Sequence, residues 1–223
     1  MLRPLALGFA LCSLVALPAR AADMNYNTPV AGPDLSYSYV EGSIFQNNTG
    51  TAIGELDGKG AEAWFSYSVL KMLHVFGGTK FVDFDDYTVN TTLVEAGAGW
   101  NYNPSPLTSM YFDLAAVSSS ADSLTPGGPK IGVDDNGYTY LFGWRSANKS
   151  RKMEFNISAQ HITYHKVDEP DTWINMGLLF RATKRLMVVT GVEATGKENL
   201  FKAGVRYYLP NRFDKRSEVT PQP

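Results

Sequence analysis

The chain has 223 residues, 19% charged side chains and a formal net charge of −2, so it lacks the basic excess that nucleic-acid binding requires. Its single cysteine, Cys12, lies in the N-terminal apolar run, and we therefore expect a mature protein without disulfides. No later apolar run is long enough for a membrane-spanning helix, which excludes a helical membrane protein.

Residues 1–21 have the features of a secretory signal peptide. Arg3 precedes an apolar run, and the small residues Ala19 and Ala21 have the spacing of a cleavage site. Cleavage after Ala21 would leave about 200 residues, a length that is common among single all-β barrels. We expect residues 22–34 and 211–223 to be flexible flanks, and residues 35–210 to form the barrel.

From residue 35 onward, alternating and aromatic-rich segments are separated by turn residues, and no long segment has helical periodicity. The predicted strands are residues 35–46, 59–69, 73–83, 87–102, 108–119, 137–146, 153–166, 173–182, 186–195 and 200–209. Most of them reach the nine to eleven residues, roughly, that a tilted membrane-spanning strand needs. The sequence therefore predicts a closed, antiparallel, up-and-down transmembrane barrel of ten strands, with eight strands as the alternative.

The connections between these strands alternate in character. One set is basic and mostly tight, and includes residues 147–152 and 183–185. The other set is acidic, and we expect residues 46–58 and 121–136 to be its two longest loops. Alternate connections of a meander lie at opposite ends of a barrel, so the two sets predict an electrically polarised molecule. Short turns at one end and longer loops at the other are typical of outer-membrane barrels.

Within each predicted strand, most charged residues alternate with apolar residues, so the charges should lie together on one face of the strand. Near-neutral pairing and many small residues on this face favour a narrow lumen, while the other parity is apolar, as lipid contact requires. The predicted lumen network has six acids and five bases: Glu41, Glu62, Lys80, Glu95, Asp113, Arg145, Glu154, Arg181, Glu193, Lys202 and Arg206. The facing of Tyr37 and Tyr39 stays open, and a break of parity at Gln160, His161 and Ile162 suggests a bulge.

Aromatic residues concentrate toward the strand ends, as in an interfacial girdle. The predicted girdle contains Trp100, Tyr102, Tyr138, Trp144, Trp173, Tyr207 and Tyr208. Ten strands enclose far less space than the 16 to 18, roughly, of a porin with a broad channel. We therefore expect a plugged or very narrow lumen and a structural or surface-binding role. A narrow porin-like channel is the first alternative, and a soluble secreted carrier of the lipocalin kind is the second.

The segment from Lys202 to Leu209 resembles the C-terminal β-signal of bacterial outer-membrane barrels. Lys202, Gly204, Tyr207 and Leu209 match its polar, glycine, aromatic and hydrophobic positions. The stretches YSYVEGSIFQ and LHVFGGTKF also resemble small porin-like outer-membrane proteins. The resemblance implies a Gram-negative envelope protein that barrel-assembly machinery recognises and that lies among outer-membrane lipid and lipopolysaccharide. The chain departs from this family in continuing beyond the signal to Pro223.

Histidines and acidic residues near the ends of the predicted barrel could in principle support catalysis or metal binding. His161 and His165 lie near acidic residues and could serve a rim hydrolase, but no nucleophile motif accompanies them, so we expect no enzyme and no cofactor. Acidic clusters could supply oxygen ligands for Ca²⁺ or Mg²⁺, although solvated loops are the simpler interpretation. The residues of these clusters are Asp83, Asp85, Asp86, Asp168, Glu169 and Asp171.

Overall fold

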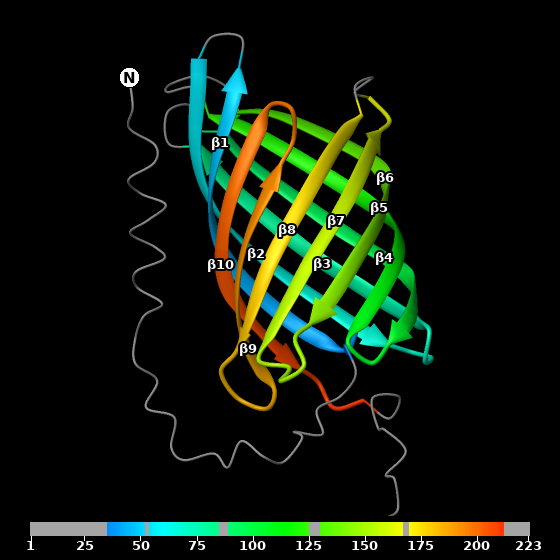
Figure 1. The fold of residues 1–223 in the computed structure, drawn as a ribbon. Helices are drawn as coiled ribbons and strands as arrows, with labels where there is room; N and C mark the ends of the chain where they lie inside the picture. Colours follow the sequence, from blue (N-terminus) through cyan, green and yellow to red (C-terminus); the bar gives the residue numbers. More distant parts are fainter. Residues whose placement is uncertain (1–34, 52–53, 85–88, 125–129, 167–169, 212–223) are drawn as a thin grey trace, which may run out of the picture. The chain divides into compact units, whose positions relative to one another are not determined.

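Ten antiparallel strands form a closed barrel in the computed structural model, which describes residues 35–51, 54–84, 89–124, 130–166 and 170–211 (Figure 1). Each strand pairs with its neighbours in the chain, and β1 closes the wall on β10. The strands are β1 Tyr39–Thr51, β2 Gly54–Ser68, β3 Leu73–Phe84, β4 Val89–Ser105, β5 Thr108–Leu124, β6 Lys130–Ala147, β7 Met153–Tyr164, β8 Asp171–Arg181, β9 Leu186–Ala194 and β10 Glu198–Tyr208. The ten-stranded up-and-down topology is therefore confirmed. Within the described ranges there is no helix of membrane-spanning length and apolarity.

Side chains alternate between the two faces of the wall along each strand, as the pleat of a β-strand requires. In β10, Phe201, Val205 and Tyr207 are exposed, whereas Arg206 and Tyr208 are buried in the interior. In β4, Glu95 is buried between the exposed Val94 and Ala96. The exterior is therefore mostly apolar, and the interior carries the charges.

The wall has two chemically different ends. At the basic end, the chain enters β1 and leaves β10, and the connections are residues 69–72, 106–107, 148–152 and 182–185. At the acidic end, the connections are residues 52–53, 85–88, 125–129, 165–170 and 195–197. Connections at both ends have between two and six residues, so length does not distinguish the ends, and charge does.

The expected long loops at residues 46–58 and 121–136 are wrong. Pairing continues from β1 to β2 as far as Thr51 and Gly54, and from β5 to β6 as far as Leu124 and Lys130. These residues are polar because the wall extends beyond its apolar zone, and polar residues still pair through their backbones. Figure 1 shows the β1–β2 hairpin projecting at this end of the barrel.

The first strand begins four residues later than expected, at Tyr39 rather than Leu35. Its pairing with β10 starts at Tyr208, and Leu209 still donates a backbone hydrogen bond to the carbonyl of Ser38 (2.8 Å). Pro210 follows, and a proline has no N–H to extend the ladder. Residues 35–38 are therefore released from the sheet and are buried inside the basic end.

Three further expectations are corrected. The register of β7 runs without a break against β6 and β8, so there is no bulge at Gln160–Ile162. Ile162 simply faces inward, and His161 faces outward against Tyr140. Trp173 and Tyr208 line the interior rather than the girdle, because both have the inward parity of their strands.

Interior aromatic side chains lie over glycines of neighbouring strands. A Cβ atom on Gly60 would lie 2.2 Å from the Phe45 ring, and one on Gly78 would lie 2.2 Å from the Trp64 ring. Tyr111 covers Gly143 in the same way. Glycine therefore supplies the room that lets large rings lie flat against the inner wall and fill a narrow barrel.

Candidate functional site

The interior of the barrel brings together the charged residues that the sequence assigned to a lumen. Each strand from β1 to β9 contributes one of the eleven residues, and β10 contributes Lys202 and Arg206. Glu41, Glu62, Glu95, Arg145, Glu154 and Arg206 are all buried, and the other five are largely covered. The groups do not form one cluster; they lie in successive tiers along the barrel axis.

The middle tier is a chain of alternating charges. The ammonium group of Lys202 donates to Glu62 (2.9 Å) and to Glu193 (2.8 Å), and Lys80 donates to the second oxygen of Glu193 (2.7 Å). Lys80 also lies 5.3 Å from the Trp173 ring centroid, a cation–π distance. Four strands are thus linked through two lysines and two glutamates, so neither lysine is a lone buried charge.

A second tier lies at the seam where the wall closes. Arg206 of β10 donates through Nε to Glu41 of β1 (2.6 Å). The same guanidinium lies 4.1 Å from the centroid of the Tyr39 ring. The residue pair Glu41 and Arg206 is also directly opposed in the β1–β10 ladder, so the side-chain contact and the backbone pairing support the same register.

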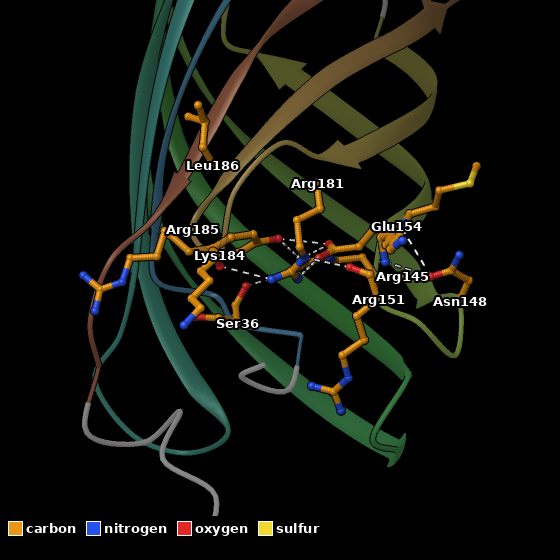
Figure 2. A network of polar contacts seen from close by, with 12 residues as sticks. Ser36, Arg145, Asn148, Arg151, Glu154, Arg181, Lys184, Arg185 and Leu186 are labelled. Carbon is orange, nitrogen blue, oxygen red and sulfur yellow. Dashed lines mark hydrogen bonds and ion pairs between the residues drawn. The ribbon is translucent and has the colours of Figure 1, made fainter. Parts of the chain in front are cut away.

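A third tier at the basic end centres on Arg145 (Figure 2). Its guanidinium donates to Glu154 (3.0 Å), to the Tyr208 hydroxyl (2.9 Å) and to the carbonyl of Ser36 (3.0 Å). The Tyr208 hydroxyl in turn donates to Glu154 (2.9 Å), and Arg181 lies 3.9 Å from the other Glu154 oxygen. Glu154 is therefore compensated by two arginines and a phenol in a buried position, where an unpaired carboxylate would be costly.

The segment of residues 35–38, which we call the inner plug, is buried inside the basic end of the barrel. The Tyr37 hydroxyl forms a hydrogen bond with Ser109 Oγ (2.8 Å), and the backbone carbonyl of Tyr37 accepts a hydrogen bond from Ser66 Oγ (2.6 Å). Ser38 Oγ accepts hydrogen bonds from the Ser68 N–H (3.0 Å) and from Asn211 (2.6 Å). The plug is therefore bonded to several strands.

Tyr37 is the centre of the plug. Its ring stacks on His74 with centroids 4.6 Å apart, and the Arg145 guanidinium lies 4.9 Å from the ring centroid. Burial raises the pKa of the Tyr37 phenol well above its ordinary value, so the phenol stays neutral. His74 Nε2 in turn lies 3.0 Å from Asp113 Oδ1. Movement of the plug out of the barrel would break these contacts.

A cavity of about 320 Å³ lies in the interior. It is lined by polar and aromatic groups that include Trp64, Glu95, Asp113, Gln160, Trp173 and Lys202. Gln160 donates to Glu95 (3.3 Å) and to Thr139 (3.2 Å). The buried side-chain oxygens Asn47 Oδ1 and Asn175 Oδ1 have no protein partner, so this cavity is suited to water or to a small polar solute.

The other sequence-derived sites are not assembled in the same way. His161 Nδ1 lies 2.9 Å from Thr172 Oγ1, and His165 Nδ1 lies 2.5 Å from the carbonyl of Asn136. Of the acidic clusters, Asp83 lies on β3 and Asp171 on β8, which are not neighbours in the sheet. Asp85, Asp86, Asp168 and Glu169 lie outside the described residues, as do the expected signal peptide and residues 22–34. The described part of the chain contains no group of three or more metal-binding side chains.

The residues of the assembly-signal pattern occupy both faces of the last strand. Lys202 and Gly204 face the interior, Tyr207 is exposed, and Leu209 follows the strand. Sequence reasoning missed the inner plug and its partners, Ser109 and Asn211. Asn211 is buried, although we expected it to belong to a flexible tail. The signal for the plug was Pro210, which ends the pairing that would have kept residues 35–38 in the sheet.

Comparison with known proteins gives matches only to solved structures. No family model matches the sequence, and no curated protein does. Neisserial surface protein A is 13% identical over 78% of this chain and 98% of its own, with a TM-score of 0.48. Ail of Yersinia pestis is 15% identical over 78% and 100% (TM-score 0.44), and the KdgM porin is 12% identical over 75% and 99% (TM-score 0.39). At these values the likeness assigns no function to this chain.

Proposed function

We propose that this chain is an integral outer-membrane β-barrel with a charge-filled interior that is closed to free diffusion, and that it has a structural or surface-binding role in the bacterial envelope. The observation that carries the proposal is the inversion of the usual arrangement, with apolar side chains outside and ionised ones inside. Ile44 is 70% exposed, Phe201 60% and Leu114 54%. Apolar exposure on this scale is typical of a surface that contacts lipid.

The apolar zone has the limits that a bilayer would impose. On β4, the outward side chains from Val94 to Tyr102 are apolar or aromatic over nine residues, about the length of a tilted spanning strand. On β5 and β6, the outward residues that follow Ala116 and precede Tyr138 are the polar Ser118 and Asn136. We infer that this part of the wall rises above the membrane and presents the acidic end to partners.

A soluble carrier of the lipocalin kind would need the opposite arrangement. Its apolar face would line the ligand cavity and its charged face would meet water. Here Glu62 and Arg145 are 5% and 3% exposed, while Phe142 is 53% exposed. The same facing supports export through the periplasm and contact with outer-membrane lipid, lipopolysaccharide and barrel-assembly machinery, as the resemblance of Lys202 to Leu209 implies.

We assign no catalysis to His161 or His165. His161 faces outward against Tyr140 and Thr172, where a water-dependent reaction would meet lipid or headgroups instead of a substrate pocket. A narrow channel remains the second candidate function, because the interior cavity of about 320 Å³ has polar walls and is interrupted at the basic end by the inner plug.

Membrane location is tested by fractionation and by gel migration. The protein should be recovered with outer membranes and should migrate differently in detergent before and after heating, because a closed barrel resists unfolding until it is heated. Recovery in the soluble periplasm or in the medium would contradict the proposal. A chain that fractionates with membranes but shows no heat-modifiable band would contradict a closed barrel.

Closure of the lumen is tested by conductance in planar bilayers. The refolded mature protein should give no large steady conductance steps. The Tyr37→Ala variant removes the ring that stacks on His74 and should admit ions at the basic end. Tyr67→Ala is the matched control, since this tyrosine is on the outer face and its removal should leave the bilayer silent. Large steps from the unmodified protein would instead favour the channel.

A further inference from the structure

We propose that the basic end of the barrel binds anionic phospholipid headgroups of the bilayer leaflet next to it. The inference rests on the proposed membrane location and adds a lipid partner to it. The connections at this end contain no Asp or Glu. They carry the exposed cations Lys71, Lys149, Lys184 and Arg185.

Among the described residues, the acids near this end face the interior of the barrel. The side chain of Glu154 is 4% exposed and is bonded to Arg145 inside the barrel. Asp113 faces the interior beside His74. Glu154 and Asp113 therefore have partners inside the barrel, and the cations of the connections form a positive rim that faces outward.

The turns that carry the cations are fixed by hydrogen bonds to one another. Arg181 donates to the carbonyls of Arg151 (2.7 Å) and Lys184 (3.1 Å), which joins the two turns 148–152 and 182–185. Asn148 Oδ1 accepts from the Lys152 N–H (2.9 Å). Figure 2 shows these contacts and the Arg185 side chain extending away from them. Because the carbonyls are taken up within the network, the rim presents cationic side chains on a rigid base.

The rim also lies at the height where headgroups would be. Trp100, Tyr102, Trp144 and Tyr207 are between 40% and 50% exposed on the outer face near this end. Tryptophan and tyrosine of this kind mark the membrane interface, and basic residues next to it are attracted to anionic lipid. A lipid headgroup is therefore favoured over a soluble anionic partner, because headgroup phosphates lie at the membrane interface next to the rim.

The experiment uses the refolded mature protein in phosphatidylcholine vesicles that contain a small fraction of brominated phosphatidylglycerol or brominated phosphatidylcholine. Bromine quenches tryptophan fluorescence at close range. Trp100 and Trp144 are the outward tryptophans at the basic end, while Trp64 and Trp173 line the interior. Quenching therefore reports the lipid beside the rim. The basic-end variant is Lys149→Gln/Lys184→Gln/Arg185→Gln, and the control of equal charge change is Lys59→Gln/Lys166→Gln/Lys197→Gln at the acidic end.

We expect the unmodified protein to prefer brominated phosphatidylglycerol by a factor on the order of five at low salt. The preference should decrease at high salt because screening shortens the reach of the charges. It should be lost in the basic-end variant and kept in the acidic-end control. Equal quenching by both lipids in the unmodified protein would overturn the rim proposal and leave the membrane location intact. Absence of quenching by either lipid would overturn both.

Discussion

Replacing Lys202 by methionine tests whether the ion pairs of the middle tier are shielded from bulk water. Lys202 bridges Glu62, whose side chain is 1% exposed, and Glu193, whose side chain is 12% exposed. Lys202→Met keeps most of the packing volume and leaves Glu62 without its ammonium partner, whereas Glu193 retains Lys80. Breaking a buried ion pair by removing one partner costs about 3–5 kcal/mol, but the cost of breaking an exposed pair is about 0–1 kcal/mol.

The measurement is equilibrium unfolding by urea in lipid vesicles, followed by tryptophan fluorescence and by the heat-modifiable band. We expect Lys202→Met to lower the free energy of unfolding by about 3–5 kcal/mol. The double variant Lys202→Met/Glu62→Gln should recover part of this loss, because the unpaired carboxylate is then absent. Lys149→Met on the rim is the control and should change stability by at most about 0.5 kcal/mol. A loss below about 1 kcal/mol for Lys202→Met would refute this shielding and would indicate a lumen that is open to bulk water.

Two further pairs of substitutions test the wall itself. Gly97→Ala should destabilise the barrel by about 1–3 kcal/mol, because the added Cβ would lie 2.0 Å from the carbonyl oxygen of Leu114. Gly42→Ala meets nothing within 4 Å and should be neutral in the same unfolding assay; equal effects would show that the steric reasoning is incorrect. Leu114→Arg places a charge in the middle of the apolar zone and should cost about 2–4 kcal/mol in vesicles. Ser118→Arg on the same strand should cost about 0–1 kcal/mol, and a reversed order would contradict the proposed membrane boundary.

Local periodicity accounts for what sequence reasoning predicted well. The face that a strand residue occupies depends only on its parity, so the alternation of Lys202, Ala203, Gly204, Val205 and Arg206 already indicates which side chains share a side. Ten segments of this kind, joined by tight connections, also predict the order of strands in a meander.

Errors arose where polarity was taken as a sign of a loop or a bulge. The polar residues beyond Gln46 and Ser118 continue to pair as strands, because backbone hydrogen bonds do not require apolar side chains. In the same way, the apolar Ile162 faces inward and the polar His161 faces outward, although the register of β7 does not change.

The sequence by itself determined the facing of the side chains and the number of strands, since both follow from a period of two and from the turns between segments. Tertiary structure alone decided which charges meet, because closure brings together groups such as Lys80 and Glu193, which are 113 residues apart. It also decided that residues 35–38 fold inward as a plug. That outcome depends on where the ladder between β1 and β10 ends and on the space that remains inside ten tilted strands, and neither is a property of a short segment.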